Sequence, residues 1–302
     1  MYAKDAQENA DFYRNVLGLR LVKKSVNQDN PYMYHLFYGD RTGSPGTELT
    51  FFEIPNAGKS HRGTNEIAKI GLLVPDEEAL QYWKERLQQF HISYQEETLY
   101  DKQTIVSFQD PDDLELFFIV NGEAPIPEFW TPWEQSPVPE HFQILGMGPV
   151  VLHVREPELT AQVLTDIFRY KAVLATDEWM IFRTEPDTLF GEIVVRKKEG
   201  ALTRPGRGYV HHLAVRASDD RALEDIAAKV KEAGYRMKEI VDRFYFKSIY
   251  FRDRNGIMFE VATDGPGFTR DEDVKHLGET LALPPFLEEK RAEIETVLKP
   301  IE

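Results

Sequence analysis

The stretch from Tyr209 to Asp264 decides the fold. It reads YVHHLAVRASDDRALEDIAAKVKEAGYRMKEIVDRFYFKSIYFRDRNGIMFEVATD. It opens with a short apolar strand, which is followed by a helix whose apolar residues recur at i, i+3, i+4 and i+7: Leu223, Ile226, Ala227 and Val230. Asp219 and Asp220 stand where an N-cap belongs, and Gly234 marks the end of the helix. Three more strand-like segments follow, so the stretch predicts a βαβββ unit.

The same pattern recurs three more times, and such internal repeats define the architecture. The third copy runs over 148–198 and the second over 67–120. The first copy begins at its helix, near Asp5, and only Met1 to Lys4 precede it, so its first strand is missing or truncated. The sequence therefore predicts an α+β fold of four βαβββ units.

Two units form each predicted domain. The first domain spans 1–122 and the second spans 146–268, with a Pro-, Trp- and Glu-rich linker at 123–145. A tail at 269–302 carries a terminal surface helix.

Composition excludes several classes of protein. The chain has 302 residues, of which 42% are apolar and 29% charged, and its length favours two domains. It contains no apolar run of about 20 residues and no signal-peptide pattern at its start. The 36 basic residues against 51 acidic ones give a net charge of −15, which argues against nucleic acid and anionic membranes as partners. The absence of cysteine excludes disulfides and thiolate chemistry and fits a cytoplasmic protein, so a metal site must use His, Asp or Glu.

The last unit carries the strongest candidate site. His211 and His212 open its first strand, and Glu260 lies in its last strand among apolar neighbours. A buried carboxylate needs a partner or a metal ion. Since adjacent strand residues point to opposite faces, only one histidine is expected to face Glu260, and the repeat spacing favours His212, with His211 as the fallback.

Other histidines are expected to be structural: His61, His91, His141 and His276 lie in polar or loop segments, and His153 lies inside a strand. His35, between Tyr34 and Tyr38, is a candidate acid or base. Tyr250 lies on the strand before Glu260, and Asp242 and Arg243 stand at a strand end; a core tyrosine and a surface ion pair remain the alternatives.

These residues resemble the vicinal oxygen chelate superfamily, which includes glyoxalase I, bleomycin-resistance proteins and extradiol dioxygenases. The segment 245–268, YFKSIYFRDRNGIMFEVATDGPGF, resembles the extradiol signature at Tyr250, Asp253, Gly256 and Glu260. Arg254 replaces the proline of that signature, and its leading histidine is absent, with Asp242 and Arg243 nearby instead.

The segments DAQENADFYRNVLGLRLVKKSVNQDNPYMYHLFYGD, VHHLAVRA and LPPFLEEKRAEIE resemble, more narrowly, ring-cleaving dioxygenases of the hydroquinone-detoxifying, MhqO type. The resemblance implies a His–His–Glu site for Fe(II), with Mn(II) or Zn(II) as alternatives, and an aromatic substrate and O₂ as partners. It implies His212 and Glu260 as metal ligands and His35, Tyr250 and Arg243 as catalytic groups.

The third ligand, a histidine, is expected upstream of Met1, because Lys69 and Pro149 occupy its place in the second and third units. Either the true start lies upstream or the protein is shortened. The ligands' origin in units one and four implies that these units share one cup and that units two and three form a second, metal-free cup.

Two other functions remain open. A glyoxalase-type lyase or isomerase would need a further Glu or Gln ligand in the last strand of unit one, where alignment of Gly46 with Gly256 places Thr50; Glu48 lies two residues earlier on the same face. A metal-poor protein that binds an aromatic compound is the second alternative. An edge left unpaired by the short first strand could also drive homo-oligomer formation.

Overall fold

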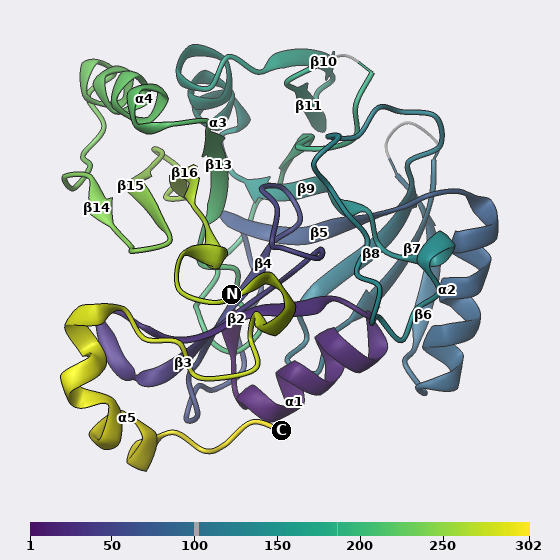
Figure 1. Cartoon of the computed structure of the whole chain (residues 1–302). Helices are drawn as coiled ribbons and strands as arrows, with labels where there is room; N and C mark the ends of the chain where they lie inside the picture. The colour runs from purple at the N-terminus through teal and green to yellow at the C-terminus, as the bar shows by residue number, and fades with distance from the viewer. Residues whose placement is uncertain (100–102, 186) are drawn as a thin grey trace.

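The chain folds into four successive βαβββ units, as the repeats predict (Figure 1). The computed structural model describes residues 1–99, 103–185 and 187–302. The strands are β1 (Tyr2–Ala3), β2 (Arg20–Asn27), β3 (Asn30–Gly39), β4 (Leu49–Glu53), β5 (Glu66–Val74), β6 (Tyr94–Thr98), β7 (Thr104–Gln109), β8 (Glu115–Val120), β9 (Gly146–Val154), β10 (Lys171–Ala175), β11 (Trp179–Arg183), β12 (Ile193–Lys197), β13 (Leu213–Ala217), β14 (Val241–Asp242), β15 (Phe246–Arg252) and β16 (Met258–Pro266). The α-helices are α1 (Ala6–Asp11), α2 (Glu77–Gln89), α3 (Pro157–Gln162), α4 (Asp220–Glu232) and α5 (Arg291–Val297). Single π-helical turns at Phe12–Val16 and Val163–Ile167 extend α1 and α3, and short 3₁₀ turns lie at Glu140–Phe142, Phe268–Arg270, Val274–His276 and Pro285–Lys290.

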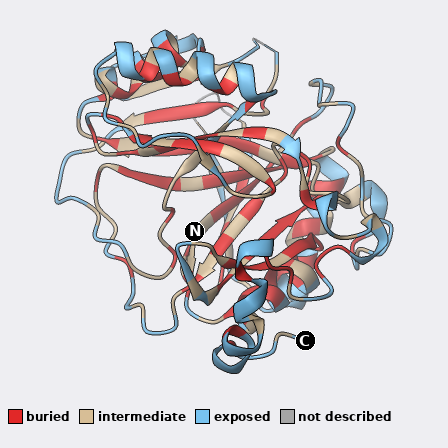
Figure 2. Cartoon of the chain, turned by 60° about the vertical axis from the view of Figure 1, so that its left-hand side comes forward, coloured by how far each residue is buried: buried red, intermediate tan, exposed pale blue. Residues whose placement is uncertain are grey.

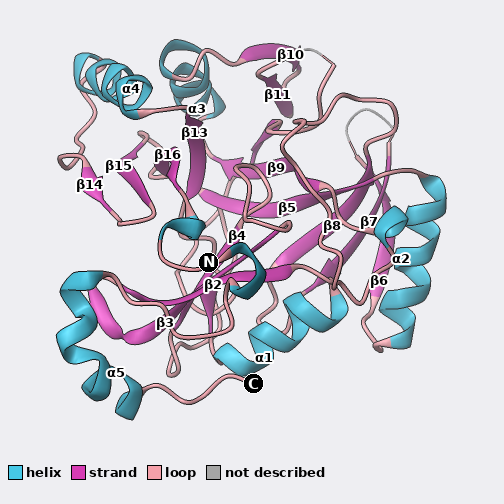
Figure 3. Ribbon diagram, viewed as in Figure 1, coloured by secondary structure: helices cyan, strands magenta, loops and turns pink. Residues whose placement is uncertain are grey.

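Every unit has the same strand topology. Its first strand runs parallel to its last: β1 with β4, β5 with β8, β9 with β12, and β13 with β16. Units one and four each form a four-stranded sheet, with the orders β1-β4-β3-β2 and β13-β16-β15-β14. Units two and three join through antiparallel β5 and β9 into one eight-stranded sheet. The helices lie on the outer faces of these sheets (Figure 3).

Unit one meets unit four along its first strand. Only Tyr2 and Ala3 form β1, so this strand is short, as the sequence predicts. Its free side contacts the segment before β13: the Tyr2 amide donates to the carbonyl of Tyr209 (3.1 Å), and the Gly208 amide donates to the carbonyl of Tyr2 (2.9 Å). The edge predicted to be unpaired is therefore partly covered within the same chain.

Local sequence signals determine the helix ends. The side chains of Asp5, Asp76 and Asp219 each accept a hydrogen bond from the backbone amide three residues on, which is N-capping geometry. Helix α4 ends just before Gly234, whose φ of +79° suits a residue without a Cβ. The predicted face of α4 buries Leu223, Ala227 and Val230, and its other residues are more exposed (Figure 2).

The inner face of the eight-stranded sheet is largely filled. An apolar cluster there contains Leu73, Ile105, Phe117, Ile119, Trp130, Val151, Leu189 and Val194. Lys69 occupies the place that a ligand histidine would have in unit two, and it forms ion pairs with Glu97 (3.0 Å) and Glu115 (3.5 Å). The expected second cup is thus occupied by side chains, and one of them, Trp130, comes from the linker. No helix in the described part of the chain is long and apolar enough to cross a bilayer.

Candidate metal and substrate site

One large cavity, of about 2220 Å³, is lined mostly by units one and four, and residues of units two and three line the rest of it. Residues of β3 and β4 line one side of it, and residues of β13, β15 and β16 line another. The predicted site residues line this cavity, namely His35, His211, His212, Arg243, Tyr250 and Glu260, whereas Asp242, which was considered with Arg243, does not. Units one and four therefore share a cup, and the groups selected as chemical candidates lie around one space.

His212 and Glu260 form the polar centre of the cavity. Glu260 is the third residue of β16, directly opposite Ala214 of β13 and Tyr250 of β15, and it is only 4% exposed. His212 lies two residues before Ala214, and its Nε2 atom is 2.9 Å from Oε2 of Glu260. Burial works to raise the pKa of Glu260, but the charge of His212 and hydrogen bonds from His212, Tyr250 and Ser248 outweigh it and lower that pKa.

Only His212 contacts Glu260, the histidine that the repeat spacing favours, but both histidines line the cavity, although strand alternation predicted that only one would face it. Strand β13 begins at Leu213, and residues 211–212 precede it in an irregular conformation, where strand alternation does not apply. The Nδ1 atoms of His211 and His212 are 2.9 Å apart, so one ring can orient the other. Burial and the charge of His212 lower the pKa of His211 to about 4, which keeps His211 neutral.

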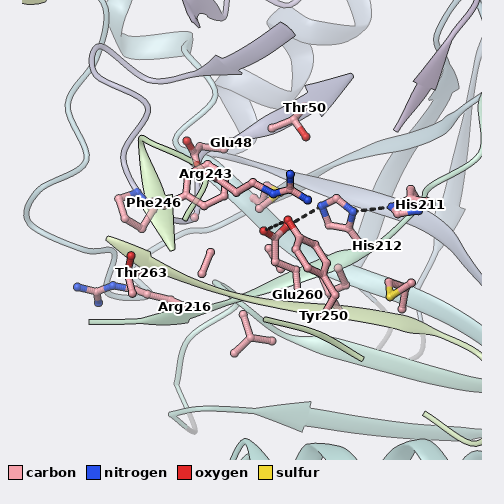
Figure 4. Close-up of a pocket in the computed structure, with 18 of the residues that line it drawn as sticks. Glu48, Thr50, His211, His212, Arg216, Arg243, Phe246, Tyr250, Glu260 and Thr263 are labelled. Atoms are coloured by element: carbon pink, nitrogen blue, oxygen red, sulfur yellow. Dashed lines mark hydrogen bonds and ion pairs between the residues drawn. The ribbon is translucent and has the colours of Figure 1, made fainter. Parts of the chain in front are cut away.

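Tyr250 and Arg243 complete the wall beside Glu260 (Figure 4). The Tyr250 hydroxyl donates to Oε1 of Glu260 (2.5 Å), and the Arg243 guanidinium lies 5.7 Å from the centre of the Tyr250 ring. Arg243 also pairs with Asp29 at 3.0 Å. Ser248, which the sequence analysis did not select, donates to the Tyr250 hydroxyl (3.3 Å). It lies two residues before Tyr250 on the same strand face, so strand periodicity could have identified it.

His35 lies on the unit-one side of the cavity. Its ring stands 4.0 Å from the rings of both Phe37 and Phe52. Its Nε2 atom is buried and has no hydrogen-bond partner among the described residues. Burial, followed by the positive charges around the cavity, lowers the pKa of His35 well below its usual value. The ring is therefore a neutral imidazole with one unused nitrogen, and a bound ligand could supply its partner.

Glu48 and Thr50 also line the cavity from unit one. Thr50 belongs to β4 and pairs with Phe37 in register, whereas Glu48 lies just before the strand. The remaining histidines lie away from the cavity lining. The Nδ1 atom of His153 lies 3.7 Å from Glu66 and 3.3 Å from Lys198, so this histidine takes part in a polar cluster outside the cavity.

The donor set fits a divalent metal ion in part. An imidazole nitrogen and a carboxylate oxygen that converge in a cavity suit Fe(II), Mn(II) or Zn(II). Tyr250 and His211 contact these two donors in the manner of groups that orient metal ligands. Within the described residues, no third His, Asp or Glu joins them in one cluster. Among the described residues, His212 and Glu260 are therefore the candidate metal donors in this cavity that contact each other.

A fold of paired βαβββ units around such a cavity defines a known superfamily. The sequence model of the Glyoxalase/Bleomycin resistance protein/Dioxygenase superfamily matches residues 1–118 and 139–261. The chain belongs to this superfamily.

Three comparisons refine that assignment. "Putative ring-cleaving dioxygenase MhqA" of Bacillus subtilis (strain 168) is 45% identical over 99% of this chain and 96% of its own length. The chlorohydroquinone/hydroquinone 1,2-dioxygenase of Sphingobium indicum is 28% identical over 96% of this chain and 91% of its own length. The crystal structure of a "putative dioxygenase" from Bacillus subtilis subsp. subtilis str. 168 superposes with a TM-score of 0.91 at 36% identity, covering 100% of this chain and 95% of that one. The likeness to MhqA confirms the predicted resemblance to the ring-cleaving group.

Proposed function

We propose that this chain is a metal-dependent ring-cleaving dioxygenase that opens hydroquinone- or catechol-type aromatics and serves to detoxify quinone-related compounds. The observation that carries the proposal is the His212–Glu260 pair, 2.9 Å apart in a cavity lined mostly by units one and four. Its relatives supply the reaction class, because MhqA and the Sphingobium enzyme are named for dioxygenase activity.

His212 and Glu260 would hold the metal ion, for which Fe(II) is the first choice and Mn(II) and Zn(II) are the alternatives. Any of these ions would supply open coordination positions, and Fe(II) or Mn(II) would also supply the redox chemistry of ring opening, which Zn(II) cannot. The chain itself fixes both donors: β16 holds Glu260, the Tyr250 hydroxyl binds one of its oxygens, and His211 contacts the ring of His212.

The neighbouring groups would control protons and charge. Burial and the charge of Glu260 raise the pKa of Tyr250, so its phenol stays protonated and can donate a hydrogen bond. Arg243 places a permanent positive charge beside Tyr250, where it would stabilise an anionic substrate oxygen. The unused Nε2 of neutral His35 would exchange a hydrogen bond with a substrate hydroxyl from the opposite side.

Oxygen uptake tests the proposal. The full chain is reconstituted anaerobically with Fe(II) and then mixed with oxygenated buffer that contains hydroquinone or catechol. We expect stoichiometric consumption of O₂ and of the aromatic, with loss of both in Glu260→Gln. A lyase would instead convert a glutathione hemithioacetal without consuming O₂. A pure binding protein would retain the aromatic unchanged, and either of these results would overturn the proposal.

A further inference from the structure

Glu48 is a carboxylic acid in the cavity without a partner in the described part of the chain. It lies two residues before Thr50 and four before Phe52, and all three side chains line the cavity. No hydrogen bond or ion pair joins its carboxyl group to another described residue. Other enclosed acids are satisfied: Glu53 accepts from the Ala6 amide (3.0 Å), and Glu66 accepts from Thr203 (2.8 Å). Glu48 is half-buried and lines the cavity, so its unpaired carboxyl group is available to a ligand bound there.

Glu48 and the His212–Glu260 pair belong to different walls of the same cavity. Glu48 precedes β4 of unit one, whereas His212 and Glu260 belong to unit four, and Figure 4 shows Glu48 standing apart from the ligand pair. The charge of Glu260 acts on Glu48, yet no hydrogen bond connects the two side chains. All three residues line the same cavity, so a ligand in it can contact Glu48 as well as the His212–Glu260 pair.

Flat rings line the space on the unit-one side. The ring of His35 lies between those of Phe37 and Phe52, with ring centres 4.0 Å apart in both cases. Two of these rings belong to β3, and Phe52 lies on the same strand as Thr50, four residues after Glu48. Aromatic surfaces of this kind pack well against a planar ligand. A ring bound here would have His212 and Glu260 on one side and Glu48 on another.

The position of the second hydroxyl group distinguishes the two candidate substrates. In a catechol the two hydroxyls are adjacent, so both can point toward the His212–Glu260 pair. In a hydroquinone they lie at opposite ends of the ring, so only one can point there, and the other must reach a different polar group. We propose that Glu48 binds the second hydroxyl of a 1,4-dihydroxybenzene whose first hydroxyl faces His212 and Glu260. This inference rests on the proposed function and assigns the residue that binds the second hydroxyl group of a hydroquinone.

The environment of Glu48 suits this role. Burial, then the charges of Glu260, Asp40 and Asp264, raise the pKa of Glu48 to about 8, so its carboxyl group is mostly protonated near pH 7. A neutral carboxylic acid can both donate and accept a hydrogen bond, as a phenol does. It also adds no repulsion toward a substrate that becomes anionic.

Ligand affinity tests the inference apart from turnover. Calorimetric titrations under nitrogen, with the full chain in saturating Zn(II) as a redox-inert ion, would compare hydroquinone, catechol and phenol. Phenol lacks only the hydroxyl assigned to Glu48. We expect the wild type to bind hydroquinone about tenfold more tightly than phenol, since one buried hydrogen bond contributes roughly this factor. Glu48→Leu should bring that ratio to within about twofold without changing phenol affinity, and Glu48→Gln should retain most of it.

Asp225→Asn is the matched control, because it removes an acid that lines the same cavity from helix α4. It should leave the hydroquinone-to-phenol ratio unchanged. Equal weakening of both ligands in Glu48→Leu, or an unchanged ratio, would overturn the role of Glu48. If the wild type still consumed O₂ with hydroquinone in that case, the proposed function would stand. Absence of both binding and O₂ uptake with every diol would overturn both.

Discussion

Replacement of Lys23 by Met should destabilise the fold strongly. Lys23 lies in β2 with a fully buried side chain, and its Nζ atom pairs with Asp271 (2.7 Å) and also with Glu272. The same ammonium group stands 4.6 Å from the ring centre of Tyr245, whose hydroxyl donates to Asp271 (2.8 Å). This cluster ties unit one to unit four and to the segment that follows it.

The magnitude follows from burial. Met has a similar volume, so the change removes the charge and leaves little empty space. The two carboxylates, 23% and 11% exposed, then lose their common cation. Removal of one partner from a buried ion pair costs about 3 kcal/mol or more, which corresponds to a decrease in Tm of roughly 6 °C or more for a chain of this size.

Urea unfolding and calorimetry would measure the effect at neutral pH. Lys59→Met is the matched control, because its pair with Asp113 (2.9 Å) is largely solvent-exposed, at 61% for Lys59, and should contribute less than about 1 kcal/mol. Addition of Asp271→Asn to Lys23→Met should recover part of the lost stability. If Lys23→Met were no less stable than Lys59→Met, the argument that this cluster holds the two units together would be wrong.

Three further predictions concern the cavity. Tyr250→Phe removes the phenol that donates to Glu260, so turnover should fall about 100-fold while metal content stays constant, as measured by oxygen uptake beside elemental analysis. Arg243→Lys should lower turnover about tenfold or more, because an ammonium group lacks the planar fork of guanidinium; an unchanged rate would count against a role for Arg243 in substrate binding. The pKa of His35 is lowered in the folded state, so His35 binds a proton near pH 6.5 only in the unfolded chain. The free energy of unfolding therefore decreases as pH falls below that value. His35→Phe should therefore show a flatter dependence of Tm on pH between 6.5 and 5 than the wild type, and equal slopes would contradict this.

The repeats made the fold predictable from sequence. Helix periodicity, N-cap aspartates and Gly234 are local signals, and the structure contains the predicted helices with those ends. The shared cup could also be expected, because candidate residues fell in units one and four. The eight-stranded sheet was less predictable, since pairing of β5 with β9 depends on contacts between segments far apart in the chain.

The details of the site depended on three-dimensional packing. Strand alternation assigned one of His211 and His212 to the cavity, but the strand begins only at Leu213, so both reach it. Glu48 was recognised only as a possible metal ligand, because the neighbouring sequence does not show whether its carboxyl group has a partner in the folded chain. Lys23 reads as an ordinary strand lysine, and its partner Asp271 lies 248 residues further along the chain.

Metal affinity tests the central claim most directly. Anaerobic Fe(II) titration with elemental analysis would compare the wild type with His212→Ala and Glu260→Gln. His153→Gln would serve as the control, since His153 lies outside the cavity lining. We predict about one ion per chain for the wild type and the control, and affinity weaker by more than about 100-fold in both site variants, because each loses a direct ligand. Equal binding by all four proteins would contradict the assignment of His212 and Glu260 as the metal site.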